Sequence, residues 1–408
     1  MYAWNNGTIP ATNTTEERET PKMIIVTFRH ETPYYDDSYA VNTANLGPWG
    51  DAINDELIPY IDSQFNTIAK PYARIQQGGS TGGWESIANV IYRPDLFGAC
   101  FSSYPDSLDF HRHQAIPLYD SASAYEYDNG SSIPSIRTCE DGPEEILASV
   151  FQENHWELTY GTNTRSYLQW DVWDVVFGAQ GLNSYPLVPW DKVTGEIYPD
   201  AVEYWKTFDL SNWVTSNWEG KLNLGEVLKN RLFVYVGTCD DYYLNEGVQF
   251  FQQAVEAKGG AGWANFTYIE GAPHGGNYQR RETWDYLEFL AGWFADHAPD
   301  GKTPLSSAVT TPAARGNIWE DVIKMGGHEA AVARQAPPTV KGTTATVGKW
   351  DPGMVLEAQW LVDGKPASTP FAVKQGDEVS FKGYKKGCLS IAVTGTKRGY
   401  EPETRTSE

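Results

Sequence analysis

The chain lacks several features that would assign it quickly to a class. It has no apolar run long enough to span a bilayer, and its first 22 residues show neither the basic start nor the apolar middle of a signal peptide. The four cysteines are scattered, without the C-x-x-C pair of a zinc or thiol-exchange site. Dinucleotide, P-loop and H-E-x-x-H motifs are also missing, so we expect neither a cofactor nor a metal.

Positive charge is scarce as well. The 408 residues carry a formal net charge of −22, and residues 1–336 hold 21 Lys and Arg against 45 Asp and Glu. An acidic body of this kind repels phosphate backbones and anionic lipid, which argues against nucleic acid as a partner. With 41% hydrophobic residues the chain can still bury a core, and its length favours one large domain plus a small one.

The segment "YARIQQGGSTGGWESIANVIY", residues 72–92, contains the pattern G-x-S-x-G around Ser80. This pentapeptide arises by chance in roughly one in four chains with this glycine content. Its significance therefore depends on the secondary structure predicted on either side of it. "MIIVTF" (23–28) is β-branched and predicts a buried parallel strand, residues 49–68 predict a helix, and "YARIQQ" predicts the next strand. Strand, sharp turn and helix around Ser80 are the context in which a serine becomes an exposed nucleophile.

Strands and helices alternate further along the chain. "FGACFSS" (97–103), "RLFVYVG" (231–237) and "ANFTYIE" (264–270) predict three more strands, with helices over 245–258 and 281–297. This pattern predicts an α/β fold with a doubly wound, mostly parallel sheet. In such sheets the loops after the strands line a common crevice, so the segments after Gln77, Gly237 and Glu270 should meet.

Two of these loops offer partners for Ser80. Asp240 and Asp241 follow the strand that ends at Gly237, and His274 follows the last strand. An imidazole can take the serine proton, and a carboxylate can fix the tautomer of the imidazole, which makes a Ser-Asp-His triad in the chain order of α/β hydrolases. His30, His111 and His113 also lie in loops that could face the crevice. Asp240 is preferred as the acid, with Asp241 as the alternative.

The segments "ELIPYIDSQF" and "GGSTGGWESIANVIYRPDLFGACFSSYPDSLDF", with the late Asp and His, resemble the esterase family that includes S-formylglutathione hydrolases, feruloyl and acetylxylan esterases and mycolyltransferases. The resemblance, over about residues 23–297, implies an α/β-hydrolase fold with Ser80 as nucleophile, His274 as general base and Asp240 as orienting acid. Family members also have a strand ending in His-Gly that supplies one oxyanion donor. No such segment is visible before residue 23, so the N–H of Thr81 is the one donor that the sequence identifies.

Aromatic residues concentrate in a long insertion over about 106–230, which predicts either a lid with platforms for sugar or phenolic groups or a satellite core. Its tryptophans are Trp156, Trp170, Trp173, Trp190, Trp205, Trp213 and Trp218. The loop after residue 28 is also rich in Tyr and Asp. We expect Tyr34, Tyr35 and Asp106 at the rim of the crevice, in contact with substrate.

The predicted organisation has four parts. They are an irregular segment (1–22), the α/β-hydrolase domain (23–300), a linker with one short helix (301–336) and an all-β module (337–408). The module has W-x-P-G, Q-W-x-x-D-G and V-T-G patterns and resembles Ig-like repeat modules of secreted bacterial hydrolases, which implies either a spacer or a carbohydrate or cell-wall contact.

The sequence supports two alternative functions. The first is a serine esterase acting through an acyl-enzyme on acyl or feruloyl esters of carbohydrates, with acyl transfer as a variant. The second is a non-catalytic carbohydrate- or surface-binding protein on the same scaffold. N-x-S/T sequons at Asn6, Asn13, Asn129 and Asn265 favour a secreted glycoprotein. The cysteines can form one disulfide, whose pairing the sequence leaves open.

Overall fold

The computed structural model describes most of the chain. The described residues are 7–11, 16–32, 35–139, 142–162, 164–180, 185–279, 281, 283–305, 337–350, 354–383, 387–396 and 403–407. The helix expected within 301–336 lies outside them, apart from residues 301–305, which precede it. None of the helices in these ranges is both long enough and apolar enough to cross a membrane.

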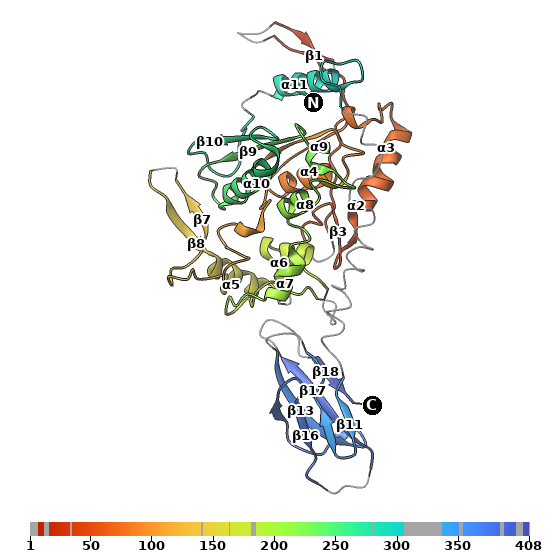
Figure 1. The fold of residues 1–408 in the computed structure, drawn as a ribbon, viewed down its shortest axis with the longest axis vertical. Coiled ribbons are helices and arrows are strands. Elements are labelled where there is room, and N and C mark those ends of the chain that lie inside the picture. The colour runs from red at the N-terminus through yellow and green to blue at the C-terminus, as the bar shows by residue number, and fades with distance from the viewer. Residues whose placement is uncertain are drawn as a thin grey trace.

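A parallel sheet organises the larger domain, in the order β10-β9-β6-β5. Figure 1 labels its strands β9 and β10. Its strands are β5 (Ile75–Gly79), β6 (Ala99–Ser103), β9 (Leu232–Gly237) and β10 (Asn265–Ile269). All three strand pairs are parallel and in continuous register, so the carboxyl ends of the strands face the same edge. The predicted α/β architecture is confirmed, and each of these strands falls where the sequence predicts it.

Helices pack on this sheet because their apolar faces need burial. The helix α4 (Thr81–Tyr92) buries nine of its twelve residues, and β6 is buried along its whole length. On the other side Phe101 of β6 packs against Trp293 of α11. The helices of the domain are α2 (Trp49–Asp51), the π-helix η1 (Ala52–Leu57), α3 (Ile58–Gln64), α4, α5 (Val150–Tyr160), α6 (Gln169–Phe177), α7 (Pro199–Trp205), α8 (Leu210–Ser216), α9 (Leu224–Val227), α10 (Leu244–Gly259) and α11 (Thr283–His297), with 3-10 turns η2 (Pro71–Ala73) and η3 (Phe110–Arg112).

One predicted strand is wrong. Residues 23–28 form no ladder with β5 or with any other described strand, and β5 is an edge of the sheet. Met23 packs against the sheet, whereas Ile24, Ile25 and Val26 are 47%, 63% and 45% exposed. A β-branched run favours a strand only where a partner edge pairs with it and covers its side chains, and this run has neither.

The N-terminal segment is not wholly irregular either. The two-residue strands β1 (Thr8–Ile9) and β2 (Arg18–Glu19) pair as a small antiparallel hairpin. Arg18 extends from β2 to the carboxylates of Asp285 and Glu288 on α11, at 2.5 and 2.8 Å. The pairing β3 (Asn42–Thr43) with β4 (Gly47–Pro48) forms a similar short hairpin before α2.

The insertion combines the hairpin β7 (Pro134–Thr138) and β8 (Glu145–Ser149) with helices α5 to α9. Most of its tryptophans belong to the main core, because Trp170, Trp173, Trp190 and Trp205 are at most 3% exposed and join one cluster with the residues of α4. These four residues are therefore core residues, but they belong to the main core and not to a satellite core. Among the tryptophans of the insertion, Trp156 on α5 is the one with a largely exposed side chain, at 49%.

The C-terminal residues form a separate all-β unit, as predicted. One sheet has the order β11-β12-β16 and the other β14-β13-β17-β18, with β15 also paired to β13. Apolar side chains such as Trp360 and Ile391 fill the core of this unit. The strands are β11 (Thr339–Lys341), β12 (Thr344–Thr346), β13 (Val355–Val362), β14 (Lys365–Pro366), β15 (Phe371–Val373), β16 (Glu378–Ser380), β17 (Leu389–Thr396) and β18 (Glu403–Thr406). Its Ig-like character stays a prediction.

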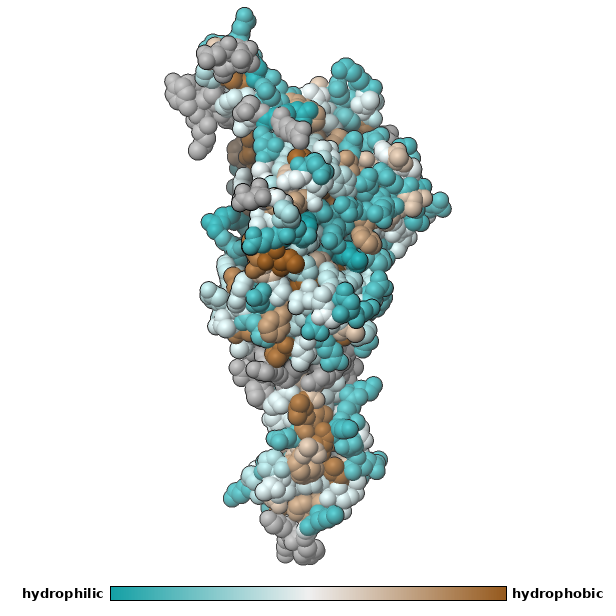
Figure 2. Space-filling model, turned by 90° about the vertical axis from the view of Figure 1, so that its left-hand side faces the viewer, coloured by the Kyte–Doolittle hydropathy of each residue, from teal (hydrophilic) through white to brown (hydrophobic). Residues whose placement is uncertain are grey.

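The surface in the view of Figure 2 is mainly hydrophilic. In this view, hydrophilic side chains cover most of the face, and apolar side chains gather in a few separate patches. Isolated apolar side chains on a surface are normal, and these patches define no partner by themselves.

Candidate active site

The turn between β5 and α4 places Ser80 at the carboxyl edge of the sheet. Ser80 has φ 58° and ψ −126°, a region that residues with a side chain rarely adopt. Its N–H donates to the carbonyl of Ser103 at the end of β6, 3.1 Å away, and its carbonyl accepts from the N–H groups of Gly83 and Trp84. The strained backbone is thus fixed by hydrogen bonds on both sides.

Glycines surround Ser80 because the turn has no room for side chains. A Cβ on Gly78 would lie 2.0 Å from the carbonyl oxygen of Gly82, and one on Gly79 would lie 2.7 Å from the ring of Tyr104. A Cβ on Gly83 would lie 2.8 Å from the carbonyl oxygen of Ser103. Gly82 is different, since a Cβ there would meet nothing within 4 Å. Three of the four glycines are therefore required by close packing.

Hydrogen bonds connect Ser80, His274 and Asp240 in one line. The Oγ of Ser80 lies 3.0 Å from Nε2 of His274, and Nδ1 of the same ring lies 2.8 Å from Oδ2 of Asp240. These three residues come from the ends of β5, β10 and β9, as the sequence predicts. The structure brings them together in the geometry that a serine nucleophile, a base and an orienting acid require.

Asp240 is the buried member of the adjacent aspartate pair. Its side chain is fully buried, and its Oδ1 accepts the N–H groups of Tyr242 at 3.0 Å and Leu244 at 3.3 Å. Asp241 instead accepts a backbone hydrogen bond from Arg137 through its carbonyl oxygen. Of the two carboxylates, Asp240 is the one that contacts His274.

The environment of His274 favours its charged form. Burial lowers the pKa of His274, but the hydrogen bond and the charge of Asp240, with a contribution from Asp106, outweigh it, and the net pKa is raised above 6.5. The ring lies between two aromatic side chains, 4.8 Å from that of Tyr104 and 4.9 Å from that of Tyr242. An imidazolium formed during proton transfer would therefore be stabilised in place.

The loops of the acid and the base are fastened to one another. The N–H of Cys239 donates to the carbonyl of Ala272, and the N–H of Gly271 donates to Oγ1 of Thr238, 2.8 Å away. A Cβ on Gly237 would lie 2.1 Å from the oxygen of Ala272, so this close approach requires glycine at the end of β9. These contacts hold the two loops at the spacing that the triad needs.

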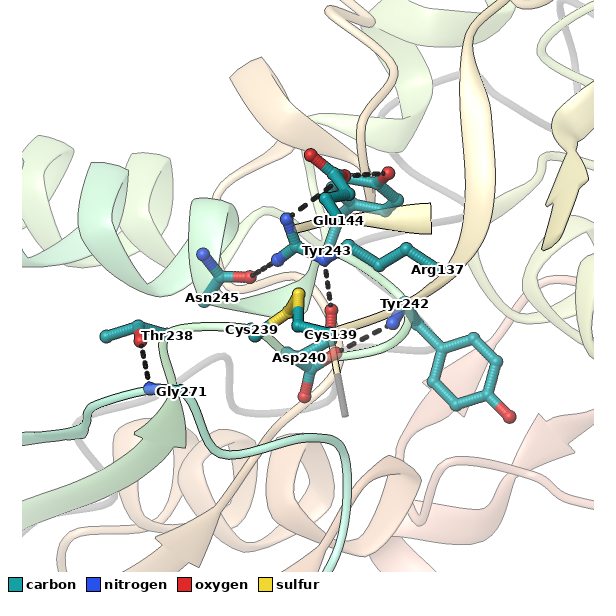
Figure 3. Close-up of a disulfide and its surroundings, with 10 residues drawn as sticks. All are labelled: Arg137, Cys139, Glu144, Thr238, Cys239, Asp240, Tyr242, Tyr243, Asn245 and Gly271. Atoms are coloured by element: carbon teal, nitrogen blue, oxygen red, sulfur yellow. Dashed lines mark hydrogen bonds and ion pairs between the residues drawn. A yellow bond between two sulfur atoms is a disulfide. The ribbon is translucent and has the colours of Figure 1, made fainter. Parts of the chain in front are cut away.

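The insertion also holds the acid loop, as Figure 3 shows. The disulfide pair that the sequence left open is Cys139–Cys239, with Cα atoms 6.3 Å apart, and it links the β7–β8 hairpin to the residue before Asp240. From β7, Nε of Arg137 donates to the carbonyl of Asp240 at 2.9 Å, and Nη2 donates to Asn245 at 3.0 Å. Nothing in the sequence pattern indicates this role for Arg137.

Thr81 is the first residue of α4, and no preceding helical turn can accept its N–H. It adjoins Ser80, as an oxyanion donor must. The Oγ1 atom of Thr81 lies 3.4 Å from Oδ2 of Asp106. A second backbone donor from a His-Gly strand is not among the described residues.

The predicted substrate contacts of Asp106 and Tyr35 are corrected by the structure. Asp106 is 3% exposed, and its Oδ2 accepts hydrogen bonds from Tyr39 and from Nε1 of Trp173, behind the turn of Ser80. Tyr35 is 5% exposed and is likewise packed inside. Short polar runs near a strand end do not reveal which side chains turn inward. Tyr34 lies outside the described residues.

The other histidines weighed as bases have different surroundings. His111 lies 2.6 Å from Asp109, and His30 faces Asp37 and Glu85. His113 is 1% exposed among aromatic rings, where burial lowers its pKa to about 3. Of these four histidines, His274 is the one bonded to Ser80.

One family model matches part of this chain. Residues 6–196 match the family model described as "Putative esterase". The match includes the turn of Ser80 and ends before Asp240 and His274, and it confirms the esterase resemblance for that part of the chain. No curated protein sequence matches the chain.

Solved structures that match part of this chain include several hydrolases. A ferulic acid esterase is 14% identical, with 61% of this chain and 62% of that chain covered and a TM-score of 0.32. An S-formylglutathione hydrolase from Agrobacterium tumefaciens is 10% identical, with 63% of each chain covered and a TM-score of 0.31. The fluorophosphonate-binding serine hydrolase F of Staphylococcus aureus is 14% identical, with 62% and 68% covered and a TM-score of 0.31. This chain thus spans less than two thirds of the first of these proteins, and likenesses this low support no activity.

Proposed function

We propose that this protein is a serine carboxylic-ester hydrolase with Ser80 as nucleophile, His274 as general base and Asp240 as orienting acid. The observation that carries the proposal is the unbroken line of hydrogen bonds from Ser80 through His274 to Asp240, at 3.0 and 2.8 Å. A protein that only binds ligands has no need of a buried carboxylate that orients an imidazole toward a strained serine. The non-catalytic alternative is therefore the weaker candidate.

The chemistry follows from the positions of these atoms. Oγ of Ser80 attacks the ester carbonyl while Nε2 of His274 accepts its proton, and the N–H of Thr81 donates to the oxyanion. Collapse of the tetrahedral intermediate breaks the bond to the alcohol, which leaves with the proton from His274. Water then repeats the sequence on the acyl-enzyme and releases the acid. Another alcohol in place of water gives acyl transfer.

For the substrate we propose acyl or feruloyl esters of carbohydrates. The ring of Tyr242 is 36% exposed and lies 4.9 Å from the ring of His274, so it offers an aromatic surface beside the proposed base. Burial raises the pKa of Tyr242, and the charges of Asp241 and of Glu153 on α5 raise it further. Aromatic surfaces of this kind suit phenolic groups and the apolar faces of sugars.

We further propose that the protein is secreted. The disulfide Cys139–Cys239 supports this location because disulfides persist in oxidising compartments. The sequon residues Asn129 and Asn265 are exposed, as glycosylation would require. A carbohydrate or cell-wall contact of the C-terminal domain also remains a proposal.

A panel of esters that differ in their alcohol tests the reaction and the substrate class together. Turnover of p-nitrophenyl acetate supports an esterase, and faster cleavage of feruloylated or acetylated oligosaccharides than of the methyl esters of the same acids supports the carbohydrate assignment. Equal rates on both types would reject that assignment. Absence of turnover on the whole panel would favour the binding protein.

A further inference from the structure

A second group of chemically reactive side chains lies away from the triad. His30 and Asp37 come from the irregular segment before α2, and Glu85 comes from α4, the helix that follows Ser80. Their side chains are 8%, 26% and 13% exposed. One donor atom from each residue lies within 4.8 Å of the other two. We refer to these three residues as the His30 cluster.

We propose that the His30 cluster binds one divalent transition-metal ion, such as Zn²⁺. One imidazole nitrogen and two carboxylate oxygens form a mixed donor set, which suits Zn²⁺ or Mn²⁺ better than Ca²⁺, an ion that prefers six to eight oxygens. Two carboxylates also balance the charge of such an ion, and water would complete its coordination.

One pair of donors has the spacing of a metal site. Nε2 of His30 lies 3.4 Å from Oε1 of Glu85, beyond the usual length of a good hydrogen bond. Two donors at about 2.1 Å from one tetrahedral ion are separated by about 3.4 Å. Oδ1 of Asp37 lies 3.4 Å from the other ring nitrogen, Nδ1, and the three donors lie within 4.8 Å of one another. Among the described residues, Oε1 of Glu85 is buried and makes no hydrogen bond, and a cation would offset the cost of burying it.

The orientation of the imidazole fits the same interpretation. The Oγ of Ser38, a fully buried residue, lies 3.0 Å from Nδ1 of His30. The backbone N–H of Ser38 also donates to Nδ1, at 3.5 Å, in the other tautomer. Metal binding requires the tautomer in which Nδ1 donates its proton to Oγ of Ser38, so that the lone pair of Nε2 points to the side of Glu85. Hydrogen bonds of this kind commonly hold the ligating histidine of a metal site in the required tautomer.

The cluster also permits an arrangement in which an imidazolium lies between two carboxylates, since Nδ1 of His30 lies 3.4 Å from Oδ1 of Asp37. That arrangement needs no metal, and an experiment can separate the two.

A bound ion would connect this segment to the proposed active site. Asp37 also accepts the backbone N–H of Tyr39, which has a φ of 57°, and Ala40 has a φ of 53°. The hydroxyl of Tyr39 donates to Asp106 behind the turn of Ser80. An ion shared by Asp37 and Glu85 would thus fasten this strained turn to α4.

The experiment uses the full-length protein without a histidine tag, freed of metal by a chelator. Titration calorimetry with ZnCl₂, and in parallel with MnCl₂ and CaCl₂, measures affinity and stoichiometry. We expect one Zn²⁺ or Mn²⁺ per chain and weaker binding of Ca²⁺. Glu85→Gln removes a ligand and should weaken binding by at least about tenfold, and Ser38→Ala should weaken it by about 10- to 100-fold through its effect on His30. Asp36→Asn, at an exposed neighbour, is the matched control and should change nothing.

Two outcomes would overturn the proposal. One is no binding by the metal-free wild type, which would leave the imidazolium between two carboxylates. The other is equal binding by wild type and Glu85→Gln, which would place the ion elsewhere. Circular dichroism verifies that the variants fold, and Asp37→Asn replaces Glu85→Gln if the latter does not. Because the readout is ion binding, either result leaves the proposal for Ser80 unaffected.

Discussion

Replacing Asp240 by Asn tests the proposed role of Asp240, which is to fix the tautomer of His274. Oδ1 of Asp240 accepts two backbone N–H groups, and Oδ2 faces Nδ1 of His274. An asparagine would keep its carbonyl oxygen on the N–H donors, so its amide would donate to Nδ1. His274 would then carry its proton on Nε2 and could not accept one from Ser80.

The expected loss follows from this change of tautomer. In serine proteases with the same triad the corresponding change lowers turnover by on the order of 10⁴-fold, or about 5.5 kcal/mol of transition-state stabilisation. We expect a loss of this size in kcat for Asp240→Asn on p-nitrophenyl acetate, with little change in KM. Asp241→Asn is the matched control, because the carboxylate of Asp240 and not that of Asp241 contacts His274. It should stay within a few-fold of wild type.

The pH profile gives an independent check of the same contact. His274 must be neutral to accept a proton, so kcat/KM should fall as the pH drops through its pKa, which in the wild type lies above 6.5. In Asp240→Asn the raising contribution is lost while burial still lowers the pKa, so the midpoint of the residual activity should move to lower pH. A severe loss confined to Asp241→Asn, or mild effects from both variants, would refute the assignment.

Three further predictions concern stability and domain roles. Cys139→Ser should lower the free energy of unfolding by about 2–5 kcal/mol in urea titrations, because the disulfide closes a loop with a sequence separation of 100. It should also reduce turnover, because the disulfide holds the residue before Asp240. An unchanged free energy of unfolding and an unchanged turnover would contradict this role of the disulfide. Gly78→Ala should lower the melting temperature strongly, since its Cβ would lie 2.0 Å from Gly82, whereas Gly82→Ala should not lower it; equal effects would contradict the close packing. A chain ending at Ala336 should retain turnover of small soluble esters, because the proposed catalytic groups and the core around them lie before this residue. A large loss of turnover with an intact circular dichroism spectrum would show that the C-terminal domain contributes to the active site.

Local sequence patterns predict the sheet well where strands are buried on both faces. β9 is rich in β-branched and aromatic residues, whereas β6 has small residues around one Phe, and both occupy the middle of the sheet. Residues 23–28 have a composition similar to that of β9 but no ladder, because a strand depends on a partner edge that composition cannot supply.

The same limit applies to the site. The order of Ser80, Asp240 and His274 at three strand ends is visible in the sequence, and their convergence follows from the parallel sheet. The burial of Asp106 depends on Tyr39 and on Trp173 of the insertion, and the disulfide pairing and the contact from Arg137 depend on how the insertion folds back on the acid loop. These contacts join residues 67 to 103 positions apart in the sequence, and no local pattern encodes them.

The most direct test of the central claim is covalent labelling of Ser80. A fluorophosphonate probe should label the wild type once, peptide mass spectrometry should place the label on Ser80, and Ser80→Ala should lose both the label and ester turnover. Since Gly82→Ala leaves the Oγ of Ser80 in place, it serves as the matched control and should still be labelled. Full turnover by Ser80→Ala, or a label on another residue, would contradict the account.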